Sequence, residues 1–155
     1  KKNKYTFLNA QVNASNKGFH NINKYSSVNS IIINENELRQ ELRDSTSDIK
    51  NLAKTLIKNK NIQNLIITRG SDGALLMNNK YRVFYCPGFA LKSIDKVGAG
   101  DAMLSLASLG LKLKLDPELV LFISSLAAAM SVESIGNREH VTYQKLDRIL
   151  EYMLK

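Results

Sequence analysis

Two glycines and a carboxylate stand together where a helix is expected to begin. Val97-Gly98-Ala99-Gly100-Asp101 leads into residues 100–111, a stretch that predicts a helix. Glycine lets the backbone approach a ligand closely, and the unpaired N–H groups of a helix start bind anions such as phosphate. The helix dipole would keep Asp101 ionised, so this carboxylate could accept a proton from a hydroxyl group that attacks phosphorus. The same residues would also suit a simple turn with Asp101 as a helix cap.

The longer segment 95–101 resembles the Asp-Thr-x-Gly-Ala-Gly-Asp signature of the ribokinase (PfkB) family of carbohydrate kinases. The resemblance implies that Gly98, Ala99 and Gly100 form an anion hole for the phosphoryl group in transfer, and that Asp101 is the catalytic base. Lys96 stands where the family usually has Thr. This departure lies in a region that helps to bind a monovalent cation in many members. A requirement for such a cation therefore stays open, since Lys96 could itself supply the charge.

Asn34 and Glu37 follow a strand predicted over residues 28–33 and resemble the family's Asn-x-x-Glu element. The resemblance implies that these two residues organise Mg²⁺ and phosphate. Because Mg²⁺ keeps several of its waters, one carboxylate acting with a nearby amide is chemically sufficient. Taken alone, Glu35 and Glu37 would equally be favoured at the N-terminus of a helix predicted over residues 35–43.

Thr68-Arg69-Gly70-Ser71-Asp72-Gly73 follows a strand predicted over residues 64–68 and resembles the family's Thr-x-Gly-x-x-Gly turn. The resemblance implies a nucleotide-binding turn in which Thr68 and Gly70 contact the phosphates of ATP. We also assign Gly73 of this motif and Val97 of the glycine loop to the nucleotide site. Glycine turns are common after strands in α/β proteins, so the motif gains weight from its order along the chain with the other two.

Small residues over 124–130, followed by Ile135-Gly136, resemble the family's helix beside the adenine ring. Ser125 occupies a position that is often Asn in the family, and we expect it in the adenine pocket. Small side chains leave room for a flat base, but they would equally let two helices approach closely.

The elements expected to carry these motifs alternate between strand and helix. Strands are predicted over 5–12, 28–33 and 64–68, and the apolar runs at 31–33 and 65–67 indicate strands covered on both faces of a parallel sheet. A loop is expected over 13–24. Ser45 and Asp48 have capping-box spacing, so we place the start of a second helix there. Its apolar stripe comprises Ile49, Leu52, Ala53, Leu56 and Ile57.

The second half of the chain predicts a hairpin and then helices. Residues 74–77 and 81–85 indicate two antiparallel strands joined by Asn78-Asn79-Lys80, with Asn supplying the tight turn. Asp116-Pro117-Glu118 predicts a helix start. The apolar stripe of that helix is expected at Leu119, Phe122, Ile123, Leu126 and Met130, and a last helix over 143–154 is expected to bury Leu146, Ile149, Leu150 and Met153.

The fold class is therefore α/β. The resemblance implies the C-terminal portion of the Rossmann-like, three-layer ribokinase fold, with a mostly parallel sheet, a β-hairpin and C-terminal helices. Residues 1–155 would form the ATP-binding and catalytic part of one kinase domain, without the substrate-binding part and the lid.

The composition excludes several classes of protein. Lys and Arg number 22 against 14 Asp and Glu, and the formal net charge of +8 favours anionic partners. The basic residues lack interleaved aromatics that would stack on bases, so we expect a solvated surface and no nucleic-acid partner. No signal peptide is visible and no apolar run is long enough to span a bilayer, which predicts no membrane partner. Cys86, the only cysteine, indicates a reducing compartment and a cytoplasmic protein. His20 and His140 have no partners at metal-ligand spacing.

The resemblance implies phosphoryl transfer from ATP, with Mg²⁺, to a hydroxyl group of a sugar or sugar phosphate. The chain alone is expected to be inactive, and an exposed sheet edge predicts self-association or pairing with an N-terminal half of the same protein. A nucleoside or vitamin-alcohol kinase of the same fold and a catalytically silent nucleotide-binding module stay open as alternatives.

A weaker resemblance concerns the segment that holds Asn13, Asn16 and Lys24. This segment is similar to kinase modules of sugar-nucleotide pathways that are related to heptose kinases and are sometimes fused to nucleotidyltransferases. We place these three residues outside the predicted site.

Overall fold

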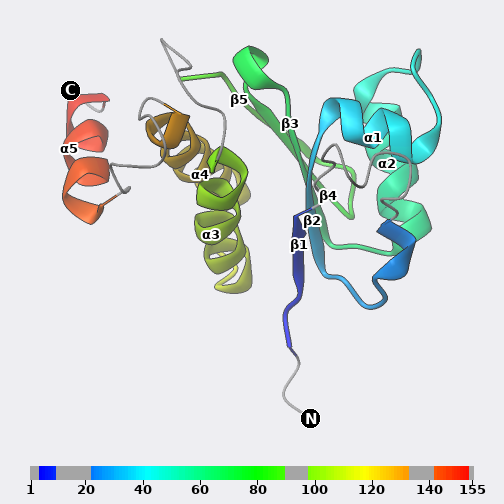
Figure 1. The fold of residues 1–155 in the computed structure, drawn as a ribbon. Helices are drawn as coiled ribbons and strands as arrows, with labels where there is room; N and C mark the ends of the chain where they lie inside the picture. Colours follow the sequence, from blue (N-terminus) through cyan, green and yellow to red (C-terminus); the bar gives the residue numbers. More distant parts are fainter. Residues whose placement is uncertain (1–3, 10–21, 90–97, 133–141, 154–155) are drawn as a thin grey trace.

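The computed structural model describes residues 4–9, 22–89, 98–132 and 142–153, and these form an α/β fold around one five-stranded sheet (Figure 1). The strands lie in the order in which they occur along the chain. Strands β1 (Phe7–Asn9), β2 (Ser30–Asn34) and β3 (Asn64–Thr68) run parallel, whereas β4 (Ala74–Asn78) and β5 (Val83–Cys86) form an antiparallel hairpin beside β3. The predicted mostly parallel sheet with a hairpin is confirmed.

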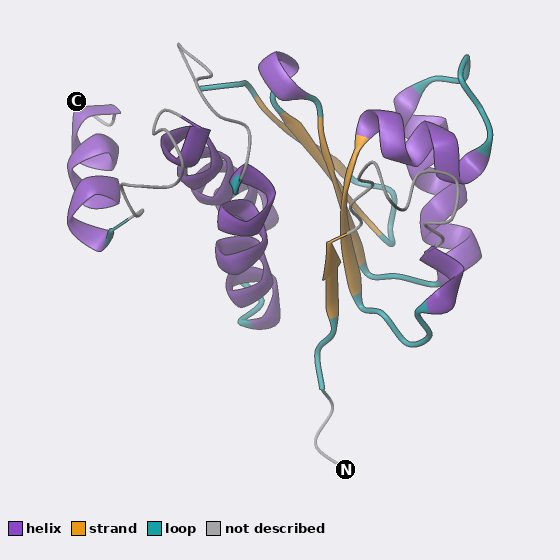
Figure 2. Ribbon diagram, in the orientation of Figure 1, coloured by secondary structure: helices purple, strands orange, loops and turns teal. Residues whose placement is uncertain are grey.

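Helices cover the two faces of the sheet as separate layers (Figure 2). Helices α1 (Glu35–Leu42) and α2 (Ile49–Lys60) pack on one face, and α3 (Ala99–Lys112) and α4 (Pro117–Val132) pack on the other. Helix α5 (Tyr143–Met153) lies beyond α4, away from the sheet (Figure 1). Short 3₁₀ turns occur at Ile22–Lys24 and Gly70–Asp72. Within the described residues, no helix is long and apolar enough to cross a membrane.

The central strands are buried on both faces, as their apolar runs predicted. Ile31 and Ile33 of β2 belong to the core beneath α1 and α2, whereas Ile32 between them belongs to the core beneath α3 and α4. This alternation follows from the two-residue period of a strand. The register also pairs Asn34 with Thr68, so the last residues of β2 and β3 lie side by side.

The predicted helix start at Ser45 and Asp48 is only half right. Asp48 is the N-cap of α2, and its Oδ1 accepts a hydrogen bond of 2.8 Å from the backbone N–H of Lys50. Ser45 has no capping role, because the preceding loop is held instead by Asp44, which accepts hydrogen bonds from the N–H groups of Thr46 and Ser47. The stripe of α2 is confirmed, since Leu52, Ala53, Leu56 and Ile57 are all buried.

The hairpin forms where it was predicted, but its turn uses a different residue for the left-handed backbone. Tyr81 has a φ of 61°, whereas Asn78 holds the turn through its side chain. The Asn78 Oδ1 atom accepts hydrogen bonds of 3.0 Å from the N–H groups of both Lys80 and Arg82. Asn side chains commonly stabilise turns in this way.

The predicted apolar stripe of α4 is only partly right: Leu126 is buried and Phe122 packs against the core, as expected, and the predicted start at Asp116 and Pro117 is confirmed. Leu119 is exposed, and the buried face is instead built from Val120, Leu121, Ser124, Ser125, Leu126, Ala127, Ser131 and Val132. The helix packs against both α3 and the sheet, so small residues are needed where two neighbours approach. At the crossing with α3, a Cβ atom on Gly110 would lie 2.7 Å from a methyl carbon of Val120. A leucine stripe could not fit this contact.

The last helix forms, but its predicted burial is not observed. Leu146, Ile149 and Leu150 of α5 are only half-buried, and the side chain of Met153 lies outside the described part of the chain. The helix lies on the outer side of α4, where the sheet cannot cover its apolar stripe (Figure 1).

Candidate functional site

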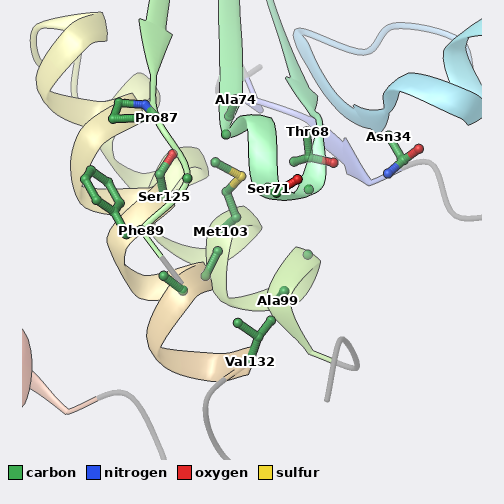
Figure 3. Close-up of a pocket in the computed structure, with 16 residues that line it drawn as sticks. Asn34, Thr68, Ser71, Ala74, Pro87, Phe89, Ala99, Met103, Ser125 and Val132 are labelled. Atoms are coloured by element: carbon green, nitrogen blue, oxygen red, sulfur yellow. The ribbon is translucent and has the colours of Figure 1, made fainter. Parts of the chain in front are cut away.

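A cavity of about 470 Å³ opens at the carboxyl ends of the parallel strands. In open α/β sheets this end of the strands is where ligands bind. Figure 3 shows Asn34 and Thr68 at one end of the cavity and Pro87 and Phe89 at the other. The cavity is lined by Asn34, Thr68, Gly70, Ser71, Gly73, Ala74, Pro87, Gly88, Phe89, Ala99, Gly100, Met103, Ser125, Ala128, Ala129 and Val132.

Asn34 reaches the cavity from the junction between β2 and α1. Its side chain caps α1, since Oδ1 accepts a hydrogen bond of 2.8 Å from the N–H of Asn36. The backbone N–H of Asn34 donates in return to Oε2 of Glu37 at 3.0 Å, which completes a capping box. The Asn-x-x-Glu spacing thus has a structural role here, and it places the Glu37 carboxylate within one helical turn of the cavity wall.

The turn after β3 forms the polar floor of the cavity. The N–H of Arg69 donates to the carbonyl oxygen of Gly73 at 2.8 Å. The N–H of Gly73 donates to the carbonyl oxygen of Gly70 at 3.1 Å. Both glycines have positive φ, 60° at Gly70 and 81° at Gly73. A Cβ atom on Gly73 would lie 2.0 Å from the carbonyl oxygen of Cys86, so only glycine fits beneath the end of β5. At Gly70 no atom lies within 4 Å of such a Cβ, and its backbone faces open space beside the cavity.

Helix α3 begins at the cavity without a side-chain cap. Gly98 is its N-cap residue, with a φ of 92°, and glycine has no side chain that could cap the helix. Ala99 and Gly100 line the cavity, so the first turn of α3 meets it with backbone and small side chains only. The positive end of the helix dipole and the first N–H groups suit an anion at this place. Asp101 follows directly in the same turn and is exposed.

The other end of the cavity is an apolar slot. The small residues of 124–130 predicted its α4 side, whereas the part played by Phe89, Met103 and Val132 was not predicted. Phe89 and Met103 form its walls together with Ala128, Ala129 and Val132 of α4. The ring of Phe89 is held edge-on against Phe122, with ring centroids 5.5 Å apart and an angle of 87°. No sequence signal showed that this aromatic ring would face the helix of small residues.

Ser125 supplies a single polar group inside the slot. The residue is 8% exposed, and no group of the described chain forms a hydrogen bond with its Oγ atom. Burial raises the pKa of Cys86, and an interaction with the Ser125 hydroxyl partly offsets that rise. A buried hydroxyl without a partner costs free energy, so this hydroxyl is available to a group that enters the slot.

One polar residue near the site was missed in the sequence. A Cβ atom on Gly100 would lie 3.4 Å from the Nδ2 atom of Asn9, so this amide lies beside the start of α3. Asn9 is the last residue of β1, just as Asn34 is the last residue of β2. Because the strand was predicted over 5–12, no local pattern marked Asn9 as its end.

The structure therefore brings together seven of the predicted site residues: Asn34, Thr68, Gly70, Gly73, Ala99, Gly100 and Ser125 all line one cavity. Glu37, Gly98 and Asp101 lie at neighbouring positions but do not line it. Val97 and Lys96 lie outside the described residues, as do Asn13, Asn16, His20 and His140. In the parts of the chain that the structure describes, no three His, Cys, Asp or Glu side chains are grouped so that they could hold a metal ion by themselves.

A glycine-rich polar end and an apolar slot at the carboxyl edge of a parallel sheet are the features of α/β proteins that bind nucleotides. Comparison with protein families identifies the particular group. Residues 1–142 match the model of the pfkB family of carbohydrate kinases, and the chain belongs to this family.

Two curated relatives illustrate the match. The bifunctional protein HldE of Koribacter versatilis is 29% identical over 130 residues, which cover 81% of this chain and 26% of HldE. The deoxyribokinase of Salmonella typhimurium is 30% identical over 110 residues, which cover 71% of this chain and 35% of the deoxyribokinase. The chain thus spans about a quarter to a third of the length of these relatives.

Solved structures show the same fold. Ribokinase from Thermotoga maritima aligns with a TM-score of 0.78 at 19% identity, covering 96% of this chain and 50% of that one. Arabidopsis thaliana ribokinase complexed with ribose and ATP aligns with a TM-score of 0.71 at 18% identity, covering 81% of this chain and 42% of that one. The predicted ribokinase fold is confirmed, and the chain corresponds to about half of these proteins.

Proposed function

We propose that this chain is the ATP-binding and catalytic part of a kinase that transfers a phosphoryl group from ATP to a hydroxyl group of a sugar or sugar phosphate. The single observation that carries the proposal is the cavity itself. Residues from four separate sequence motifs line one space, with the three phosphate-binding motifs at one end and Ser125 in an apolar slot at the other.

The slot suits the adenine base. Phe89 and Val132 offer flat or branched apolar surface, and Ala128 and Ala129 leave room between them. The Ser125 hydroxyl would form its missing hydrogen bond with a polar atom of the base. The triphosphate would then extend across Thr68 and Gly70 towards the start of α3.

At the start of α3, the backbone N–H groups at 98–100 would stabilise the negative charge that develops on the transferred phosphoryl group. Asp101, in the same helical turn, would accept the proton of the attacking hydroxyl group. Its exposure lets a substrate reach it, and the helix dipole favours its ionised form.

Asn34 and Glu37 would hold Mg²⁺ beside the phosphates, directly or through water. The absence of a three-carboxylate cluster in the described residues fits such a site, because Mg²⁺ bound to a nucleotide takes most of its ligands from phosphate and water. Bound Mg²⁺ would neutralise charge on the phosphates. A monovalent cation would belong near residues 95–96, which lie outside the described part of the chain.

The sugar would be bound mainly by residues that are not in this chain, since the relatives are about two to three times as long. Strand β1 lies at one edge of the sheet, and an N-terminal half of the same protein or a second copy of the chain would pair with it. The family's function in small-molecule metabolism and the lone buried Cys86 support a cytoplasmic location. The basic surface is assigned to solvent, without a nucleic-acid partner.

The proposal is tested by ATP binding and by turnover. The unmodified chain should bind MgATP in a calorimetric titration, and Asp101→Asn should bind it with similar affinity. In the complete protein, the same substitution should lower kcat by about 10²–10⁴ because it removes the general base. Turnover that survives Asp101→Asn would remove this residue from the catalytic role.

The acceptor substrate is tested by a panel of sugars, sugar phosphates, nucleosides and vitamin alcohols offered to the complete protein with MgATP. Phosphorylation of a nucleoside or a vitamin alcohol instead of a sugar would select the first alternative. ATP binding without phosphorylation of any acceptor would select a silent nucleotide-binding module.

A further inference from the structure

A chain of charged side chains connects the two turns that form the polar end of the cavity. Glu35 is the first residue of α1 and Arg69 is the first residue after β3. The Nε atom of Arg69 lies 2.8 Å from Oε2 of Glu35, and the Nη2 atom of Arg39 lies 2.8 Å from Oε1 of the same carboxylate. Arg39 also donates from Nε to Glu35 Oε1 at 3.1 Å and from Nη1 to the carbonyl oxygen of Ser47 at 3.0 Å. Both carboxylate oxygens of Glu35 are therefore bound.

These contacts differ from ordinary surface ion pairs. The side chains of Glu35, Arg39 and Arg69 are only 22–30% exposed, and each guanidinium group donates more than one bond or bridges two segments. The hydrogen bond from Arg69 lowers the pKa of Glu35, and burial opposes it; the bond to Glu35 raises the pKa of Arg69. A half-buried, multiply bonded carboxylate of this kind holds a more defined geometry than a solvated pair.

The position of the pair relative to the sheet gives it a specific role. The ladder between β2 and β3 ends with Asn34 opposite Thr68, and both of these residues line the cavity. Glu35 and Arg69 are the next residues on each chain. Their side-chain contact therefore joins the two strands one residue beyond the last backbone pair. Beyond this point β2 leads into α1 and β3 leads into the glycine turn.

Arg69 is directed away from the cavity in this arrangement. It does not line the cavity, and its guanidinium group contacts Glu35 and, at 3.8 Å, the carboxylate of Asp72. This geometry assigns it a role through other residues and not a direct contact with a ligand.

We propose that Glu35 and Arg69 are positioning residues that fix the start of α1, with Asn34 and Glu37, against the turn that carries Thr68 and Gly70. The proposal rests on the function proposed above, because it gives the two turns the tasks of holding Mg²⁺ and phosphate. The pair sets the distance between these two groups, and it couples Mg²⁺ binding to nucleotide binding.

The test compares Glu35→Gln, Arg69→Gln and the double variant in the full chain. Affinity for ATP is measured by calorimetry with Mg²⁺ and with EDTA. The ratio of ATP affinity with Mg²⁺ to ATP affinity in EDTA should fall about tenfold in each single variant. The ATP affinity in EDTA itself should stay within about twofold of that of the unmodified chain. The double variant should be no worse than either single variant, because both substitutions break the same contact. Asp72→Asn is the matched control: it removes a carboxylate beside Arg69 at the exposed end of the network and should change neither affinity.

Hydrogen exchange provides a second readout that needs no nucleotide. Glu35→Gln and Arg69→Gln should each increase the exchange rate of the amides at 34–37 and 68–73 about tenfold, with the amides of β4 unchanged. If both the Mg²⁺ gain and the exchange rates equal those of the unmodified chain, the proposal is wrong. A loss of ATP affinity that occurs only in Arg69→Gln, and in EDTA as well as with Mg²⁺, would show that Arg69 binds phosphate directly. This result would also contradict the proposal.

Failure of the proposed function has a different signature. In that case the unmodified chain binds no ATP with or without Mg²⁺. The proposed coupling between Mg²⁺ binding and nucleotide binding is then refuted together with the proposed function. The exchange rates then decide alone whether the pair fixes the two turns.

Discussion

We predict that the hydroxyl of Ser125 has opposite effects on stability and on ATP binding. Without a ligand it is buried and has no hydrogen-bond partner among the described residues, which costs free energy. Ser125→Ala should therefore leave the free energy of unfolding unchanged or raise it by about 1 kcal/mol in urea denaturation. The same substitution should weaken ATP binding about three- to tenfold, because the base loses a hydrogen bond worth about 1 kcal/mol.

Ser124→Ala is the control for this prediction. Ser124 is buried like Ser125, but its Oγ atom donates to the carbonyl oxygen of Val120 at 2.7 Å and does not line the cavity. It should leave ATP affinity unchanged. Equal ATP affinities for the Ser125→Ala variant and the unmodified chain would contradict a contact between this hydroxyl and the nucleotide.

The lowered pKa of Asp44 makes the stability of the α1–α2 loop depend on pH. The Ser47 hydroxyl and the backbone N–H groups of Ser47 and Thr46 lower the pKa of Asp44 to about 2. Because the folded pKa lies below the unfolded value, Asp44 contributes its full stabilisation above about pH 4 and loses it as the pH falls towards 2. Glu35, whose pKa is also lowered, acts in the same direction.

Thermal unfolding of the unmodified chain and of Asp44→Asn, followed between pH 2 and pH 6, measures this dependence. Asp44→Asn should show a shallower fall of Tm with acid, since it retains only the contribution of Glu35 and other carboxylates. Two curves of identical slope would mean that the Asp44 contacts do not persist in solution.

At the scale of elements, the two glycines of the turn after β3 show separately what a lack of room for a Cβ atom costs and what a positive φ costs. Gly73 packs its Cα against the end of β5, where a Cβ would overlap the Cys86 carbonyl oxygen at 2.0 Å, and it also has a φ of 81°. Gly70 has a φ of 60° but open space around it. Gly73→Ala should thus cost more than about 3 kcal/mol, and Gly70→Ala only the conformational cost of about 1–2 kcal/mol.

Chemical denaturation measures both values, and Gly70→Ala is the matched control because it has the same substitution in the same turn. Gly70→Ala should stay folded but bind ATP more weakly than the unmodified chain, because its methyl group would lie beside the proposed phosphate site. Similar unfolding free energies for the two variants would show that β5 does not pack on this turn as described.

The elements that the sequence predicted best are those whose signal is local. The runs of Ile at 31–33 and 65–67 indicated the buried strands, and Asp116-Pro117 indicated the start of α4. The stripe of α4 could not be predicted from hydrophobicity, because its buried face is selected by the close approach of Gly110 and Val120 and contains serines and alanines. Phe89 and Asn9 were missed for the same reason: their place in the site depends on contacts between distant segments.

At the scale of the whole molecule, the two ends of the sheet have different tasks. The carboxyl ends of the strands carry the cavity, whereas the opposite ends are fixed by a polar cluster. There the Tyr5 hydroxyl hydrogen-bonds to Ser30 Oγ, and Asn64 Nδ2 donates to both. Ser30 is fully buried, and the cluster joins the short edge strand β1 to β2 and β3. The position of β1, and of Asn9 at its end, is therefore set from the far side of the sheet.

Among the described strands β1 lies at an edge of the sheet, and this edge and an exposed apolar surface predict that the chain self-associates. Leu109, Leu113, Leu115 and Leu119, at the turn from α3 to α4, are each 47–61% exposed. Such a group of large apolar side chains on one surface favours association, since each Å² removed from water contributes about 25 cal/mol. Sedimentation equilibrium should give a mass above 17.4 kDa that rises with concentration.

Replacing two of these residues, in the double variant Leu109→Lys and Leu113→Lys, should return the mass towards 17.4 kDa, because charged side chains resist burial without a partner. Tyr152→Lys is the matched control: it places the same charge at an exposed apolar residue of α5, distant from this surface, and should leave association unchanged. If association persists in the double variant, the edge of β1 is the contact that holds the copies together. A monodisperse monomer of the unmodified chain at all concentrations would refute the prediction for both surfaces.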